Sequence, residues 1–461
     1  MATPALSLLA RFSLPAVGLR ARVLRAGGWT VAGFALGQAI RFAGNLVMTR
    51  LLVPEMFGVM AIALMVMYGL ALFSDVGLRQ SVVQSRRGQE AAFLNTAWAI
   101  QIARGFVIWG AALLISISLV AAGRFGGFPL ESVYADPSLP SVIAVLAASA
   151  IIGGFESTRL HEASRTLSLA RVTRVELASQ VCGLACMIAW ALVDRSIWAL
   201  VAGALCAAGL RTLLSHAWLP GAPNRWRWDS AAAREILAVG RWILVASVLG
   251  FLVNSADRLI LGALVDSAVL GVYAIAFLLF GAVEQVLVKI VGDVSFPALS
   301  EVARERPAAL RSAYYRFHLA VGLPACFAAG LLVAAAEPLV AVLYDPRYAE
   351  AGWMLQTLAI ALVTLPFRVA TQCFVVLGEP AQMSAICAIR LAALCAAVPL
   401  GWHFFGLPGA LWAIVLSYFS TLPTTLAFVV RHGLFDLRQE LALIPAFLVG
   451  FGVGQALTYV L

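Results

Sequence analysis

Long runs of apolar residues alternate with short polar turns along nearly the whole chain. A helix that crosses a membrane needs about 20 mostly apolar residues. About thirteen runs meet this requirement, and they are continuous rather than alternating, which favours α-helices over membrane β-strands. The predicted spans cover residues 28–48, 56–78, 92–121, 139–157, 170–193, 196–218, 236–263, 269–291, 313–336, 351–377, 382–404, 408–430 and 440–460. We therefore expect an all-α polytopic membrane protein.

One stretch of this pattern occurs twice. Residues 27–63 align without a gap onto residues 240–276, a shift of 213 positions, and 12 of the 37 pairs are identical. The identical pairs include three pairs of glycines and one pair of tryptophans: Gly27/Gly240, Trp29/Trp242, Gly37/Gly250 and Gly58/Gly271. Six predicted spans separate the two copies, so both have the same orientation in the membrane. This is the parallel-repeat arrangement of some secondary transporters.

The repeat predicts two parallel six-helix bundles around a central cavity, plus about one extra C-terminal helix. We expect a basic amphipathic cytoplasmic lead-in over residues 1–25 and an N-terminal bundle over 26–220. A cytoplasmic linker over 221–235 then leads to a C-terminal bundle over 236–431 and a further transmembrane helix over 432–461. The repeated stretch would form the hinge between the first two helices of each half.

Composition agrees with a membrane protein, because 62% of residues are hydrophobic and only 12% are charged. Soluble domains are nearer half apolar and a quarter charged. The seven cysteines lie in apolar segments without the spacing of a metal site or a disulfide framework. No nucleotide-binding, kinase or hydrolase motif is present. We therefore expect no enzyme activity, no metal and no cofactor.

The net charge of +9 is carried almost entirely by arginine, which in a soluble protein could indicate nucleic acid. Here the basic residues are distributed by side of the membrane. If the N-terminus is cytoplasmic, 23 of the 32 basic residues fall on the cytoplasmic side and five on the other. The positive-inside rule thus predicts a cytoplasmic N-terminus, and thirteen spans would place the C-terminus outside. Nucleic acid is not an expected partner.

Several polar residues lie inside the apolar runs, where a charge at the bilayer centre costs about 2.5–3.5 kcal/mol on insertion scales. Such residues must face a cavity or a partner. The candidates for substrate binding share helix faces in the first, third and tenth spans: Gln38, Arg41, Asn45, Gln101, Arg104, Arg368 and Gln372. Guanidinium groups bind phosphate oxygens in a bidentate manner, so these residues indicate an anionic substrate.

A second group of charged residues is a candidate for gating or ion coupling: Asp75, Asp257, Arg258 and Glu284. Two interpretations stay open for both groups. In the first, the side chains line a water-filled cavity; in the second, they tie helices together or snorkel at helix ends. Arg390 is expected at the membrane interface instead.

Several segments resemble a known family. RLLVPEMFGVMAIAL, DVGLRQSVVQSR and LNTAW in the first half, and NSADRLILGALVDSAVLGVYAIAF and VSFPALSEV in the second, resemble Wzx-like polysaccharide flippases. These form a branch of the multidrug/oligosaccharidyl-lipid/polysaccharide exporter superfamily. The resemblance covers about residues 20–430. Many members have fourteen spans, whereas this chain has about thirteen.

The resemblance implies a transporter of undecaprenyl-pyrophosphate-linked oligosaccharide in the bacterial inner membrane, working by alternating access. Arg41 and Arg104 would hold the pyrophosphate or acidic sugars, and Arg368 matches more loosely. A polysaccharide polymerase and glycosyltransferases are the implied partners, with the lipid bilayer itself. The alternatives are an ion-coupled multidrug or small-molecule antiporter, a lipid II flippase, and a membrane polymerase or ligase.

Overall fold

The computed structural model describes residues 16–129, 131–165, 169–379 and 381–459. Most of the lead-in predicted over residues 1–25 therefore lies outside the described residues. The described residues form helices and no strand, so the all-α prediction is confirmed. The helices of the first half are α2 (Ala16–Leu51), α3 (Pro54–Phe73), α4 (Leu78–Gln84), α5 (Ala91–Arg124), η1 (Val133–Ala135), α6 (Leu139–Leu146), α7 (Ala148–Gly154), α8 (Arg159–Arg165), α9 (Leu169–Val193) and α10 (Trp198–Ala217).

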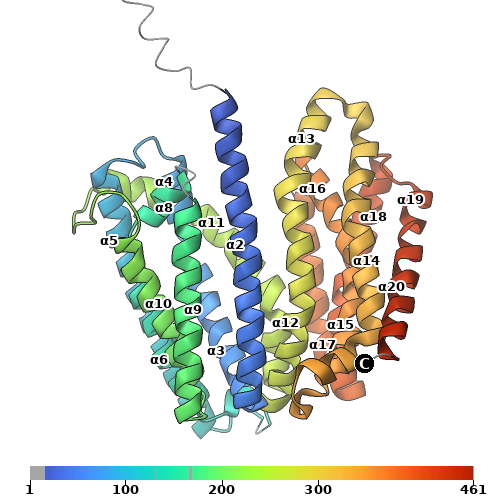
Figure 1. Cartoon of the computed structure of the whole chain (residues 1–461), viewed down its shortest axis with the longest axis horizontal. Helices are drawn as coiled ribbons and strands as arrows, with labels where there is room; N and C mark the ends of the chain where they lie inside the picture. The colour runs from blue at the N-terminus through green and yellow to red at the C-terminus, as the bar shows by residue number, and fades with distance from the viewer. Residues whose placement is uncertain (1–15, 130, 166–168, 380, 460–461) are drawn as a thin grey trace, which may run out of the picture. The chain divides into compact units, whose positions relative to one another are not determined.

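The second half also consists of long helices joined by short ones (Figure 1). They are α11 (Ser230–Leu264), α12 (Ser267–Ile290), η2 (Val291–Ser295), α13 (Phe296–Glu305), η3 (Pro307–Ala309), α14 (Leu310–Leu343), η4 (Pro346–Tyr348), α15 (Ala351–Ala359), η5 (Ile360–Phe367), α16 (Arg368–Val376), α17 (Ala381–Phe419), α18 (Leu422–Arg431), α19 (Leu437–Leu441) and α20 (Leu443–Thr458). Among the described residues, ten helices are long and apolar enough to cross a membrane. An eleventh span results if the bent segment from α6 to α8 is counted as one.

Most of the predicted spans fall on these ten helices or on the bent segment, whereas the predicted span 28–48 lies in α2, which is not among the ten found in the described residues. A further difference has a local cause. Residues 381–431 count as one long segment, although the sequence predicts two spans there. Inside it Gly406 has a positive φ of 62°, which breaks the helical path near Pro408. The break falls between the predicted spans 382–404 and 408–430.

The described chain divides into two compact units. Of the described residues, unit 1 contains those up to 48, those within 70–114 and those within 144–245, and unit 2 contains those within 49–69, those within 115–143 and those from 246 onward. Each unit therefore takes segments from both sides of a predicted bundle boundary. The two six-helix bundles remain a prediction.

The repeat is visible in the helix boundaries. In the first copy α2 ends at Leu51 and α3 begins at Pro54; in the second, α11 ends at Leu264 and α12 begins at Ser267. Both pairs of boundaries are separated by the shift of 213 positions that aligns the sequences. Each copy therefore folds as two long helices joined at the same short turn.

The last helix packs inside unit 2. A Cβ on Gly330 of α14 would come within 2.1 Å of the Phe447 carbonyl oxygen, and one on Gly450 of α20 within 2.1 Å of the Phe327 carbonyl oxygen. Glycines at both positions let the two backbones touch, which is how membrane helices often associate. Figure 1 shows α20 beside α14. The segment 437–458 is also long and apolar enough to span a membrane, as predicted for the thirteenth span.

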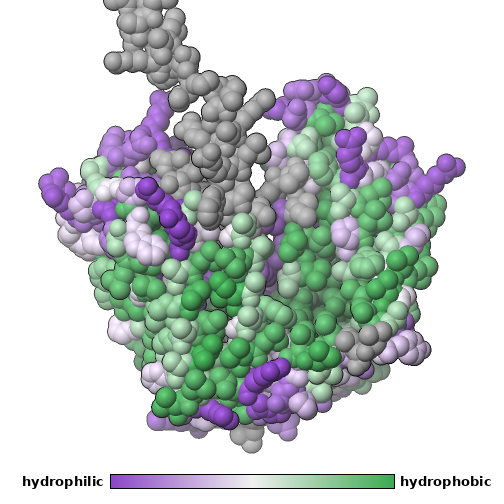
Figure 2. All heavy atoms as spheres, viewed as in Figure 1, coloured by the Kyte–Doolittle hydropathy of each residue, from purple (hydrophilic) through white to green (hydrophobic). Residues whose placement is uncertain are grey.

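The surface follows the same division between apolar and polar positions. Figure 2 shows mostly hydrophobic atoms over the middle of the helices and hydrophilic atoms at their ends. Large apolar side chains on this surface are exposed, among them Leu114, Ile117, Leu192 and Phe405. Lipid chains would cover such side chains in a bilayer. The chain is a multi-pass membrane protein.

Candidate functional site

In unit 1 the first polar group lies on one face of α2. The Arg41 guanidinium donates through Nε to Gln38 Oε1 at 2.8 Å and also through Nη2 to the same oxygen. Arg41 is exposed, and Asn45 lies one turn further along the helix. The predicted grouping of Gln38, Arg41 and Asn45 on one face therefore agrees with the helix. Among the described residues, Arg41 is held by Gln38 of its own helix through Nε and Nη2.

Arg104 of α5 contacts the end of α3. Its Nε donates to Ser74 Oγ at 3.1 Å and its Nη2 to the Ala71 carbonyl oxygen at 2.5 Å. The last carbonyls of a helix lack partners within the helix and carry partial negative charge. Arg104 thus caps the C-terminal end of α3. Asp75, in the following turn, accepts a hydrogen bond from the Gly77 amide at 2.9 Å.

Gln101, one turn before Arg104, also donates hydrogen bonds to carbonyl oxygens at a helix end. Its Nε2 donates to the carbonyl oxygens of Gly153, Gly154 and Glu156 at 3.0–3.2 Å. Gly153 and Gly154 end α7, and Glu156 lies in the turn that follows. The helix face shared by Gln101 and Arg104 is therefore used to hold two neighbouring helix ends, and its predicted contact with substrate stays a prediction.

Unit 2 contains a cluster of charged and aromatic side chains. Asp257 of α11 is buried and accepts a hydrogen bond from Tyr273 Oη at 2.8 Å. The adjacent Arg258 lies 3.7 Å from Asp257 Oδ1 and donates through Nη2 to the Asn254 carbonyl oxygen at 2.7 Å. Its guanidinium carbon stands 4.2 Å from the centre of the Phe277 ring. Arg258 is therefore held by a carboxylate, a carbonyl and an aromatic face.

Arg368 and Glu284 form an ion pair between α16 and α12. Arg368 Nη2 lies 2.8 Å from Glu284 Oε1, and the side chains are 33% and 15% exposed. Arg368 is the first residue of α16, directly after the η5 segment of 3₁₀-helix. Such a segment inside a span often marks a functional hinge or a strained sequence. Gln372 follows one turn later on α16, as the spacing predicts.

The sequence did not reveal that Arg390 belongs with this cluster. The predicted place of Arg390 at the membrane interface stays a prediction. Its guanidinium carbon stands 3.8 Å from the centre of the Tyr418 ring, and Tyr418 is buried. Tyr418 meets Phe280 edge to face at 6.1 Å, and Phe280 lies 5.8 Å from Phe277. A row of aromatic rings therefore joins Arg390 to Arg258. The spacing of aromatic residues at 273, 277 and 280 on one face of α12 was the available signal.

The described polar groups of the two units are rich in arginine. Five guanidinium groups, from Arg41, Arg104, Arg258, Arg368 and Arg390, accompany three carboxylates, from Asp75, Asp257 and Glu284. In the described residues no group of three or more His, Cys, Asp or Glu side chains could hold a metal ion. These groups can bind anions by charge and hydrogen bonding.

Residues 47–352, about two thirds of the chain, match the family described as polysaccharide biosynthesis protein. The chain belongs to this polysaccharide biosynthesis family. The chain is 21% identical over 316 residues to the lipopolysaccharide biosynthesis protein WzxC of Escherichia coli K12. That match covers 67% of this chain and 60% of WzxC, so the chain spans about 60% of the length of this curated relative.

Solved structures share the fold of this family member. The lipid II flippase MurJ in an inward closed conformation matches with a TM-score of 0.64 at 9% identity, over 94% of this chain and 98% of MurJ. An inward-facing multidrug resistance MATE transporter of the MOP superfamily matches with a TM-score of 0.60 at 16% identity, over 86% and 94% of the two chains. At these identities the likeness concerns the fold. The predicted Wzx-like family and the all-α polytopic fold are thus confirmed.

Proposed function

We propose that this chain is a flippase that moves an oligosaccharide linked to undecaprenyl pyrophosphate across the bacterial inner membrane, for surface polysaccharide biosynthesis. Membership of the polysaccharide biosynthesis family and the similarity to WzxC support this assignment. The observation that carries it is the excess of guanidinium groups over carboxylates among the polar side chains of the spanning helices. Keeping that excess in a membrane is costly, and an anionic substrate is a reason to keep it.

The substrate chemistry fits these side chains. A pyrophosphate offers several anionic oxygens, and a guanidinium binds two of them in a bidentate manner. Arg41 is the leading candidate for this contact, because it is exposed and its bonds to Gln38 use only Nε and Nη2. The lipid tail would stay in the bilayer while the head group crosses. Alternating access between the repeat halves would carry the head group to the periplasmic leaflet.

The remaining polar residues take supporting parts in this proposal. Gln38 and Asn45 orient Arg41 and the sugar, while Arg368 and Gln372 offer a second polar face in unit 2. Asp257, Arg258 and Glu284 are candidates for gating or ion coupling. The cytoplasmic N-terminus, and cooperation with a polymerase and with glycosyltransferases, belong to the same proposal.

The test is a flipping assay in proteoliposomes with undecaprenyl-pyrophosphate-linked glycan, scored by access of an external enzyme to the head group. Wild type, Arg41→Ala and Arg41→Lys are compared with Arg124→Ala, an exposed arginine at the end of α5. We expect Arg41→Ala to lose at least about tenfold in rate, because about 1.5–3 kcal/mol of charged hydrogen bonding is removed. Arg41→Lys should keep part of the wild-type rate, and Arg124→Ala should keep all of it.

Two outcomes would reject the proposal. If wild type leaves the glycolipid in place but exchanges a small cation, the protein is an antiporter. If it moves lipid II and not the oligosaccharide carrier, it is a lipid II flippase. Equal rates for Arg41→Ala and Arg124→Ala would instead remove Arg41 from the substrate site.

A further inference from the structure

The connection between α10 and α11 carries the sequence NRWRWD at residues 224–229. All four central side chains are exposed, and Trp226 and Trp228 are 71% and 61% exposed. Indole rings are usually well covered, so two of them exposed within three residues require an explanation. We propose that residues 225–228 form a membrane-interface site that binds the head groups of anionic phospholipids.

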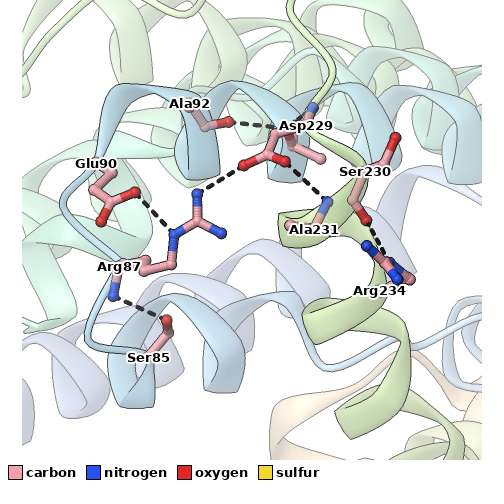
Figure 3. A network of polar contacts seen from close by, with 9 residues as sticks. Ser85, Arg87, Glu90, Ala92, Asp229, Ser230, Ala231 and Arg234 are labelled. Atoms are coloured by element: carbon pink, nitrogen blue, oxygen red, sulfur yellow. Dashed lines mark hydrogen bonds and ion pairs between the residues drawn. The ribbon is translucent and has the colours of Figure 1, made fainter.

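The segment is fixed at both ends to α5. The Arg225 amide donates to Asn95 Oδ1 at 2.8 Å, and the Asp229 amide donates to Thr96 Oγ1 at 2.9 Å. Asp229 Oδ2 also accepts from Arg87 Nη2 at 2.7 Å, and Figure 3 shows Arg87 between Glu90 and Asp229. Because adjacent residues of α5 hold the two ends, the exposure of the side chains between them is a built feature of the fold.

The upstream side is fixed as well. The Asn224 amide group donates to Thr158 Oγ1 at 2.7 Å and accepts from Ser157 Oγ at 2.9 Å. Arg159 Nε donates to the Ala222 carbonyl oxygen at 3.2 Å. The polar groups of the connection are thereby largely satisfied by the protein. What remains for another partner is the set of four exposed side chains.

The position of Trp226 indicates the depth of this site. Its ring meets Trp98 of α5 edge to face at 6.4 Å, and Trp98 meets Phe155 at 6.3 Å. Trp98 lies seven residues into a helix of 34 residues, about 10 Å along its axis at 1.5 Å per residue. A span needs only about 20 residues, so this aromatic group falls near the level where head groups meet the acyl chains.

The charges favour a lipid surface with negative head groups. Nearby carboxylates have other partners: Asp229 is paired with Arg87 and Glu156 with Arg211 at 3.2 Å. Among the described residues, no ion pair joins an acidic side chain to Arg225 or Arg227. Tryptophan prefers the membrane interface, and each arginine near an anionic surface gains about 1 kcal/mol. The combination of exposed indoles and available guanidinium groups matches anionic head groups over acyl chains.

The experiment measures which lipid lies next to the two indoles. Full-length protein is reconstituted in phosphatidylcholine that contains a small fraction of brominated phosphatidylglycerol or brominated phosphatidylcholine. Bromine quenches nearby tryptophan, and the emission of a Trp226→Phe/Trp228→Phe variant is subtracted to isolate these two residues. The same subtraction is made in an Arg225→Gln/Arg227→Gln background. Arg234→Gln is the matched control, since Arg234 is exposed and bonds to the Ser230 carbonyl oxygen of its own helix.

We expect brominated phosphatidylglycerol to quench with a higher apparent affinity than brominated phosphatidylcholine. Each of the two arginines should contribute about a fivefold increase, the ratio that about 1 kcal/mol represents. The preference should disappear in Arg225→Gln/Arg227→Gln and persist in Arg234→Gln. Equal quenching by both lipids would overturn the anionic preference. Quenching by aqueous iodide and by neither lipid would overturn the membrane site and point to a water-exposed surface for a protein partner. None of these readings depends on whether the protein transports glycolipid.

Discussion

Gly58 of α3 and Gly271 of α12 lie against the start of each other's helix. A Cβ on Gly58 would stand 1.9 Å from the Ser267 carbonyl oxygen, and one on Gly271 would stand 1.9 Å from the Pro54 carbonyl oxygen. Pro54 and Ser267 are themselves equivalent under the shift of 213 positions, as are the two glycines. The contact is therefore reciprocal, as two copies related by a twofold axis would make. The repeated glycine marks the place where the copies touch backbone to backbone.

This contact predicts that Gly58→Ala and Gly271→Ala each destabilise the protein. Backbone atoms block the added methyl group, so the helix starts must separate, with an expected loss of about 1–3 kcal/mol. Thermal unfolding in detergent, followed by tryptophan emission, measures the loss. Gly110→Ala in α5 is the control, because nothing lies within 4 Å of its Cβ position. A neutral result at Gly58 and Gly271 would show that the helix starts are not in contact.

The different partners of Arg41 and Arg104 predict different consequences of removing them. Arg104→Ala leaves the end of α3 without its cap, so we expect a stability loss of about 1.5–3 kcal/mol. Among the described residues, Arg41 is hydrogen-bonded to Gln38 of its own helix, so the thermal midpoint of Arg41→Ala should stay close to wild type while transport falls. Thermal midpoints and flipping rates of both variants separate the structural role of Arg104 from the substrate-binding role of Arg41. Unchanged stability of Arg104→Ala would argue against the cap and return Arg104 to the list of substrate ligands.

The ion pair between Arg368 and Glu284 predicts a strong coupling between two substitutions. Glu284→Gln leaves a partly buried guanidinium without its counter-charge, and Arg368→Gln leaves a largely buried carboxylate. The two single-variant losses of unfolding free energy should add up to more than the loss in the double variant. The difference, which is the coupling energy, should be on the order of 1–3 kcal/mol. A double-mutant cycle of unfolding free energies measures it. Additive effects would mean that the pair contributes nothing to stability.

The Asp229 carboxylate at the start of α11 predicts a pH dependence of stability. The hydrogen bond from Arg87 holds the pKa of the Asp229 carboxyl below its ordinary value of 3.8. A lowered pKa means that the folded protein favours the charged form. The stabilisation is therefore complete above the ordinary pKa and is lost as the pH falls through the lower value of the folded state.

We expect wild type to lose more of its thermal stability than Asp229→Asn when the pH is lowered from about 5 to about 3. Asp229→Ala adds a second loss at every pH, since Asp229 Oδ1 also accepts from the Ala231 amide at 2.9 Å at the start of α11. Parallel curves for wild type and Asp229→Asn would show that the charge on Asp229 does not matter.

Several features of the fold could be predicted from the sequence. The break between α2 and α3 follows from Pro54, and the matching break between α11 and α12 follows from the repeat. The face shared by Gln38, Arg41 and Asn45 follows from helical periodicity. In each case the relevant residues are close in sequence, or the repeat relates one position to another.

Which side chains pair was decided by the tertiary structure. Glu284 meets Arg368 across 84 positions, and Arg104 reaches α3 across more than 30. Arg390 is placed over Tyr418 by the packing of α17 upon itself. The sequence by itself determined which segments are apolar enough to cross a membrane, because a spanning helix must be apolar and satisfy its own backbone hydrogen bonds there. Only the tertiary structure decided whether a charge inside those segments caps a helix, pairs with another charge or stays available, because its partner comes from a helix distant in sequence.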